Sequence, residues 1–320
     1  MARRRRGLPI DGVLLLDKPK GMSSNFALQR ARRLYQAQKA GHTGTLDPMA
    51  TGLLPVLFGE ATKFSSHLLE ADKVYRTRVE LGRSTDTGDA EGNVIAEGVV
   101  PSLCEADVAS MVDSFIGEQD QLPPMYSALK HQGRKLYELA REGKSVDRAT
   151  RRIRVYDARL LSASLAGNAP AFELEVRVSK GTYVRTLAED MAKALGCEGH
   201  ISQLRRLKTG PFDAEGMLDF ERLEADDAAA REAHLAPIDS LLQHLPAHRL
   251  SEAGVAAMRF GRTARGEVEQ HALAQMTASE GSLYRLYQGE SFIGLGLVEP
   301  VGDIVPRRLL SSFVAGSGQD

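Results

Sequence analysis

Residues 41–55 read GHTGTLDPMATGLLP, a stretch with three glycines, two prolines, one histidine and a single acidic residue, Asp47. A proline after Asp47 disfavours helical dihedral angles at that residue and favours an extended conformation. The glycines allow tight turns and the close approach of a bulky ligand. The pattern predicts a stiff loop that presents one carboxylate. An Asp-Pro surface turn gives the same pattern, and a phosphate-binding loop is disfavoured because no Lys-Ser or Lys-Thr follows the glycines.

The segments around this stretch carry apolar residues at the period of strands or of helices. We expect strands at the start of 12–24 and within 73–82, 151–161, 172–181 and 199–212, and helices within 24–36, 59–69, 105–117 and 182–196. Ser24 or Asn25 is available to cap the helix at 24–36, whereas Thr182 can begin and Gly196 can end the helix at 182–196. Strands and helices in this mixed order predict an α+β domain around an antiparallel sheet.

The pattern of the sequence changes after residue 246, where short expected strands are separated by glycines, as in 283–300. We therefore place a domain boundary near Pro246, which gives domains of 1–246 and 247–316. Within the first domain, the block at about 122–152 opens on two prolines and is rich in lysine, arginine and tyrosine. We expect it to be an insertion that core packing covers poorly, with one short helix around 136–140.

Charge is segregated along the chain although the formal net charge is only -1. Residues 1–40 hold ten basic and two acidic residues, among them Arg3 to Arg6 and Lys20, and residues 130–154 hold nine basic and three acidic residues. Residues 213–232 instead hold eight acidic and two basic residues. Two basic blocks balanced by an acidic one are expected where one face meets phosphates. Any single block is also explained as the solvated face of a helix.

Composition excludes several classes of protein. With 42% hydrophobic and 26% charged residues over 320 positions, the chain is long and apolar enough for one large and one smaller globular domain. Its two cysteines, Cys104 and Cys197, are too few for a disulfide framework and lack the spacing of a zinc site. No apolar run approaches the length of a membrane span. We expect a cytoplasmic protein that does not enter a membrane.

Three further segments supply candidate functional side chains. Tyr75 lies on an expected strand, where its ring can stack on a flat ligand or sit as an ordinary half-buried sheet tyrosine. Tyr183 and Arg185 fall in the first turn of an expected helix, an end that favours negative groups, so Arg185 needs a partner, most simply a carboxylate. Leu204 is apolar in a basic strand that also contains Arg205, which is equally explained as a sheet edge protected by charge.

Taken together, six motifs carry a family resemblance. In order they are GHTGTLDPMATGLLP, KVYR, RSTDTGD, PPMYSALKHQGRKLYELAR, SKGTYVRTLAEDMA and HISQLRR. From about residue 9 to 214 the chain resembles the bacterial TruB family of tRNA pseudouridine synthases, and the C-terminal part is more faintly similar to a small PUA-type RNA-binding domain. The resemblance implies a pseudouridine synthase fold, with a mixed, mainly antiparallel central sheet flanked by helices and a small β-rich C-terminal domain. Thr45 and Met49 depart slightly from the loop motif.

The resemblance also implies roles for individual residues. Asp47 matches the catalytic nucleophile, Tyr75 the tyrosine packed on the target base, and Arg185 the arginine paired with the carboxylate. Tyr75 is also a candidate catalytic residue for the removal of the proton from C5. His42, Tyr183 and Leu204 match positions that contact the nucleotide or fill the gap it leaves. We expect Lys20, Lys130, Arg134 and Arg205 to bind RNA.

The implied reaction converts uridine 55 in the T loop of tRNA to pseudouridine by base flipping, and it needs neither a cofactor nor a metal. The implied partner is tRNA, bound through its T arm and acceptor stem by a monomer. Two other classes fit less well. An RNA-binding or tRNA-folding factor without catalysis can dispense with Asp47 and Arg185, and a glycosidase-like hydrolase needs two cooperating carboxylates.

Overall fold

An eight-stranded sheet forms the body of the protein in the computed structural model, which describes residues 7–268 and 282–315. Arg3 to Arg6 therefore lie outside the described residues. The strands follow one another in space as β1 (Gly12–Lys18), β3 (Thr51–Phe58), β12 (Gly199–Thr209), β4 (Lys73–Leu81), β11 (Ala171–Val178), β10 (Arg151–Ser164) and β7 (Gly117–Gln121), and β2 (Ala40–His42) pairs with β3. Among the described strands of this sheet, only the neighbours β3 and β12 run parallel. The predicted mixed, mainly antiparallel sheet is confirmed.

Strand β3 is covered on both faces, because its residues are almost continuously apolar. Leu54, Val56 and Phe58 share a core with α1 (Ser24–Leu34). The alternate residues Leu53 and Leu57 share a second core with η1 (Gly59–Phe64) and α2 (Ser65–Glu70). Successive side chains of a strand point to opposite faces, so α1 and the η1–α2 segment sandwich the strand that follows Asp47.

The remaining helices of the body cover the other half of the sheet or extend from it. Helix α3 (Glu105–Ser114) contacts β10, and α5 (Val184–Ala194) contacts β12 and β4. The ribbon of β5 (Arg83–Thr85) and β6 (Val94–Glu97) follows β4. After β12 come three short helices, α6 (Phe220–Ala225), α7 (Ala228–Ala233) and η2 (Ile238–Leu242). No helix within 7–268 or 282–315 is long and apolar enough to cross a membrane.

Two predicted helix caps are wrong. Ser23, not Ser24 or Asn25, accepts the capping hydrogen bond from Phe26 N. The hydroxyl of Ser24 is instead buried against Leu46 in the loop before Asp47. Thr182 donates its hydroxyl proton to Ser179 O and does not cap α5. In both cases the side chain binds another backbone group, which for Ser24 lies in a distant loop and for Thr182 in the preceding turn.

Strand β12 lies between β3 and β4, so the alternative reading of this basic segment as a sheet edge is wrong. Its Arg206 is 1% exposed and donates hydrogen bonds to Leu53 O and Gly44 O. This buried guanidinium joins β12 to the two ends of the loop that carries Asp47.

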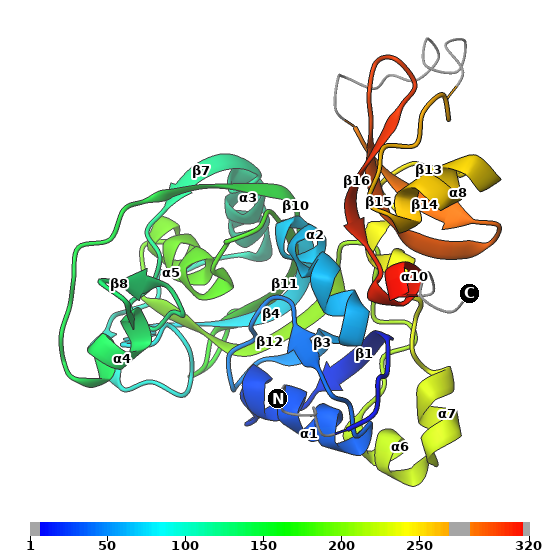
Figure 1. Ribbon diagram of the computed structural model, residues 1–320. Coiled ribbons are helices and arrows are strands. Elements are labelled where there is room, and N and C mark those ends of the chain that lie inside the picture. Colours follow the sequence, from blue (N-terminus) through cyan, green and yellow to red (C-terminus); the bar gives the residue numbers. More distant parts are fainter. Residues whose placement is uncertain (1–6, 269–281, 316–320) are drawn as a thin grey trace.

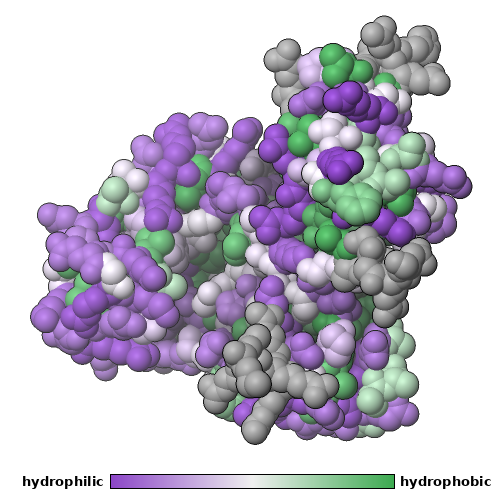
Figure 2. Space-filling view, in the orientation of Figure 1, coloured by the Kyte–Doolittle hydropathy of each residue, from purple (hydrophilic) through white to green (hydrophobic). Residues whose placement is uncertain are grey.

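The insertion leaves the sheet at Gln121 and returns at Arg151, which are paired residues of neighbouring strands. Between them lie β8 (Lys130–His131), β9 (Arg134–Lys135) and α4 (Leu136–Arg141), the short helix that the sequence predicts. Leu136 and Leu139 of α4 are buried. The surface of the insertion is mostly hydrophilic, and the insertion extends from the side of the body opposite the C-terminal strands (Figures 1 and 2).

A separate four-stranded sheet follows residue 246, with the order β13 (Ala247–Arg249), β14 (Leu283–Gln288), β15 (Ser291–Val298) and β16 (Ile304–Leu309). Helix α8 (Glu252–Arg259) packs within its own apolar cluster, and α10 (Ser311–Ala315) ends the described chain. Leu295 and Leu310 reach the core of η1, α2 and η2. The small β-rich C-terminal part that the sequence predicts is confirmed.

Candidate active site

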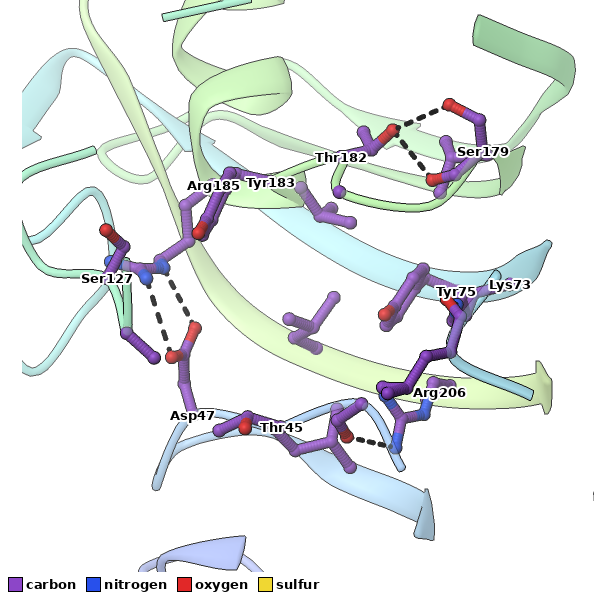
Figure 3. Close-up of a pocket in the computed structure, with 18 residues that line it drawn as sticks. Thr45, Asp47, Lys73, Tyr75, Ser127, Ser179, Thr182, Tyr183, Arg185 and Arg206 are labelled. Atoms are coloured by element: carbon purple, nitrogen blue, oxygen red, sulfur yellow. Dashed lines mark hydrogen bonds and ion pairs between the residues drawn. The ribbon is translucent and has the colours of Figure 1, made fainter. Parts of the chain in front are cut away.

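A pocket opens on the sheet face covered by α5, between the Asp47 loop, β4, the root of the insertion and the start of α5 (Figure 3). Only residues 43–50 separate β2 from β3, so the loop is shorter than the 41–55 stretch that the sequence singles out. Asp47, Tyr75, Tyr183, Arg185 and Leu204 all line the pocket. These five predicted site residues come from segments up to 157 positions apart and meet in one cavity.

Arg185 and Asp47 form the ion pair predicted from the position of the arginine at a helix start. Arg185 Nε lies 2.9 Å from Asp47 Oδ2, and Arg185 Nη2 lies 3.4 Å from Oδ1. The Arg185 side chain is only 4% exposed, whereas that of Asp47 is 35% exposed toward the pocket. The guanidinium therefore holds both carboxylate oxygens from the protein side and leaves the acid accessible to a ligand.

Backbone carbonyls fix the rest of the guanidinium. Nη1 donates to Thr87 O at 2.6 Å, and Nη2 donates to Tyr126 O at 2.7 Å. Asp89 adds a second carboxylate, with Oδ2 4.0 Å from Arg185 Nε. Asp89 is itself buried and does not line the pocket, and its Oδ1 accepts from Thr87 Oγ1 and Glu91 N. Asp47 is thus the one carboxylate that lines this cavity.

Burial raises the pKa of the Asp47 carboxyl above its ordinary value, and the nearby Asp89 adds to the rise. The charge and hydrogen bond of Arg185 oppose this shift, as does the charge of Lys18. Desolvation disfavours the ionised form of an acid, and an adjacent cation favours it. The two cations therefore favour the ionised form of Asp47 against the effect of burial.

The loop is fastened on both sides of Asp47. Before it, the buried Ser24 hydroxyl accepts from Leu46 N at 2.8 Å and donates to Leu46 O at 2.9 Å. After it, Lys18 Nζ donates to Pro48 O at 3.3 Å and to Met22 O at 2.6 Å. Burial lowers the pKa of Lys18 to about 8. Leu46 and Pro48 flank the acid, so these contacts restrict the carboxylate before any ligand binds.

Two glycines, Gly44 in the loop and Gly52 at the start of β3, make room for Arg206. Gly52 has a φ of +96°, and a Cβ atom built there would lie 2.3 Å from Arg206 O. Gly44 has a φ of +72°, with Arg206 Nη1 3.0 Å from the same hypothetical atom. From the sequence we expect these glycines to allow the close approach of a ligand. In the structure a buried arginine takes that space, while the positive φ values explain the need for glycine.

Comparisons with known proteins place the chain in a family. Residues 32–184 match the model of the TruB family pseudouridylate synthase N-terminal domain, and residues 185–243 match the tRNA pseudouridylate synthase B C-terminal domain. Residues 246–310 match the pseudouridine synthase II TruB C-terminal model. The chain is 60% identical over 312 residues to tRNA pseudouridine synthase B of Chromohalobacter salexigens, covering 98% of each chain. The chain belongs to the TruB family.

Other relatives extend this result. The TruB-family chain is 50% identical over 303 residues to tRNA pseudouridine synthase B of Azoarcus sp. strain BH72, covering 95% of this chain and 96% of the relative. Among solved structures, it resembles a chain of the archaeal box H/ACA sRNP Nop10–Cbf5 complex with a TM-score of 0.68 and 23% identity. That match covers 97% of this chain and 92% of the other. A chain of an H/ACA RNP bound to a substrate RNA containing 2′-deoxyuridine gives a TM-score of 0.66. These two structural matches support the fold.

His42 is the one predicted nucleotide contact of this TruB-family chain that does not line the pocket. It ends β2, and its Nδ1 is buried without a hydrogen-bond partner in the described part of the chain. Burial and the charge of Arg206 lower the pKa of His42, which favours the neutral ring.

The four predicted RNA-binding residues fall into two groups. Lys20 and Lys130 form no ion pair with any residue that the structure describes. Arg205 instead contacts Asp17, with Nη2 2.6 Å from Oδ2, and Arg134 pairs with Glu142. These two arginines carry charges that are already compensated within the protein.

Sequence reasoning missed several residues of the site. Lys18 and Arg206 are basic residues that the sequence places in charged segments, yet both are fully buried. Lys73 also lines the pocket, and burial lowers its pKa to about 8. The position of Lys18 at the end of an apolar strand is the one feature of the sequence that indicates its burial. Nothing in the local sequence marks Gln121, which lies at the root of the insertion.

Proposed function

We propose that this TruB-family protein isomerises uridine 55 in the T loop of tRNA to pseudouridine, with Asp47 as the nucleophile. One observation carries the proposal. A single carboxylate, held on two oxygens by a buried guanidinium, faces a cavity that also presents Tyr75, Tyr183 and Leu204. That combination suits attack on a nucleotide whose flat base lies against aromatic and apolar side chains.

In the proposed reaction Asp47 forms a transient bond to the nucleotide, at C1′ of the ribose or at another electrophilic atom. The bond between C1′ and N1 breaks, the uracil turns within the pocket, and C5 bonds to C1′. The proton on C5 is lost, N1 gains a proton, and the carboxylate is released. Nothing is oxidised or reduced. The residues of the pocket need only stabilise charge, position the nucleotide and exclude water.

The target base must leave its stacked position before Asp47 can reach it. Extrusion costs on the order of a few kcal/mol, and stacking on an aromatic side chain returns roughly 1 to 3 kcal/mol. We assign that stacking to Tyr75, which lines the pocket from β4. His42 is proposed to fill the place that the extruded base leaves.

We further propose that the protein acts as a cytoplasmic monomer, with the insertion on the T arm and the domain of 247–316 on the acceptor stem. The domain of residues 1–246 would then contain the active site. The exposed, unpaired charge of Lys130 supports RNA binding by the insertion. Arg134 and Arg205 are paired with acidic residues of the protein, so we expect each to contribute less to RNA binding than Lys130.

The reaction is tested by incubating the purified chain with an unmodified tRNA transcript and mapping pseudouridine at single-nucleotide resolution. We expect one pseudouridine, at position 55, and none in a transcript with cytidine at that position. A transcript that stays unmodified, or is modified elsewhere, would refute the proposed function. Substantial release of free uracil would instead support the hydrolase class.

Removing the charge of the insertion should weaken tRNA binding and flatten its salt dependence. Each lost phosphate contact reduces the slope of log Kobs against log salt by about 1. We expect about this change for Lys130→Ala and less for Arg134→Ala, because Glu142 compensates Arg134. Lys193→Ala, a last-turn lysine of α5, is a control. Filter binding between 50 and 200 mM salt measures the slopes, and an unchanged slope in Lys130→Ala would show that this charge only solvates the surface.

A further inference from the structure

Gln121 makes an unusual contact at the root of the insertion. It is the last residue of β7 and is 3% exposed. Its side-chain Oε1 accepts from Tyr183 N at 2.8 Å, and its Nε2 donates to Tyr183 O at 3.0 Å. One side-chain amide therefore contacts both backbone groups of Tyr183, the residue before α5, whose carbonyl also accepts from Leu187 N.

This contact matters because α5 has no cap of its own. Tyr183 occupies the N-cap position, and no side chain accepts from the first turn. Unpaired backbone groups in a buried place are costly, so the chain must satisfy them from elsewhere. Gln121 supplies the acceptor for one of these groups, the N–H of the N-cap residue Tyr183, across 62 positions of sequence.

A second contact joins the same two segments five residues further along. Tyr126 O accepts from Arg185 Nη2 at 2.7 Å. The insertion continues from there, and its helix α4 is tied back by Leu136 N to Leu129 O and by Tyr137 N to Ser127 O. The segment 121–129 thus links the basic insertion to both Tyr183 and Arg185.

We infer that Gln121 is a positioning residue for the reaction, which sets Arg185 against Asp47 by fixing the start of α5 to the root of the insertion. Arg185 is two residues from the backbone that Gln121 holds. A shift of this turn would lengthen the contacts of both oxygens of Asp47 with the guanidinium. The inference rests on the proposed role of Asp47.

The amide chemistry of Gln121 provides a sharp test. Gln121→Met keeps the length and approximate volume of the side chain but removes the donor and the acceptor. Gln121→Glu keeps the acceptor for Tyr183 N and places a second acceptor against Tyr183 O. Gln119→Met is the matched control, because Gln119 lies on the same strand and its amide donates to Phe115 O, away from the pocket.

We expect Gln121→Met to lower the single-turnover rate of pseudouridine formation about 10- to 100-fold, the scale of a small misplacement of catalytic groups. The dissociation constant for tRNA should change less than about threefold, and Gln119→Met should match the wild type in rate. Gln121→Glu should fall between Gln121→Met and the wild type. Equal rates for Gln121→Met and Gln119→Met would overturn the inference.

A double-mutant cycle separates positioning from a general loss of structure. If Gln121 acts through Arg185, Gln121→Met should cost little in an Arg185→Lys background, because the group that it positions is already lost. Fully additive losses would overturn the inference, and so would a loss in rate that follows only the loss of thermal stability. Should Gln121→Met fail to fold, the same cycle is run with Gln121→Glu.

The two proposals fail in different ways. If the wild-type chain forms no pseudouridine, the proposed function fails. If the wild type and Asp47 variants behave as proposed while Gln121→Met retains full rate, only the inference about Gln121 fails.

Discussion

Asp47→Asn is expected to abolish pseudouridine formation, with a fall in single-turnover rate of at least about four orders of magnitude. The amide of asparagine is nearly the same size as the carboxylate, but it is neutral and is not a nucleophile at neutral pH. The loop contacts through Leu46 and Pro48 involve backbone atoms and remain in the variant. The loss should therefore appear in chemistry and not in the shape of the pocket.

Binding and stability measurements distinguish this outcome from misfolding. We expect tRNA affinity within a few fold of the wild type and a melting temperature within a few degrees. Asp113→Asn, at an exposed position of α3, should keep full activity. If Asp47→Asn retains substantial activity, the assignment of Asp47 as the nucleophile is wrong.

Arg185→Lys should lower the single-turnover rate by about two to three orders of magnitude, on the scale of losing a preorganised charged donor. The guanidinium contacts both oxygens of Asp47 and donates to two backbone carbonyls. An ammonium group cannot span these four positions, and at least one buried carbonyl would lose its partner.

The control for this variant is Arg83→Lys. Arg83 pairs with Glu97 on the surface, with both side chains more than half exposed, so the exchange should leave the rate unchanged. Wild-type turnover by Arg185→Lys would show that a point charge suffices and that the two-oxygen contact has no role in the reaction.

The sequence predicts the parts of this site whose signals are local. Proline after Asp47 and the unfavourable place of Arg185 at a helix start indicate a presented acid and a partner for the arginine. The observed pair confirms that partner across 138 positions of sequence. Period-two and helical patterns likewise predict the main strands and helices, because burial of one face shapes those segments directly.

Features that depend on distant partners were not predictable. The place of Ser24 in the sequence predicts a helix cap, but its hydroxyl hydrogen-bonds to Leu46 instead. Arg206 lies in a basic segment that suggests an exposed charge. In the structure it is buried and donates to two backbone carbonyls of another segment. Gln121 has no local signal, since its partner Tyr183 comes close only when the sheet forms. In each case a hydrogen bond over a long sequence separation decides the role.

The central claim is that Arg185 keeps Asp47 ionised in a pocket that would otherwise protonate it. Only the carboxylate attacks, so the rate should rise with pH through the pKa of Asp47. Burial raises that pKa above the ordinary value of about 3.9, and Arg185 opposes the rise. Replacing Arg185 should therefore move the acid limb of the rate profile to higher pH.

The deciding measurement is the single-turnover rate of pseudouridine formation by the wild type and by Arg185→Gln, which removes the charge, between about pH 4.5 and 8, a window above the ordinary aspartate pKa. The account predicts that the rate of Arg185→Gln falls on acidification at a higher pH than that of the wild type. Two profiles with the same acid limb, or two that are flat, would contradict it.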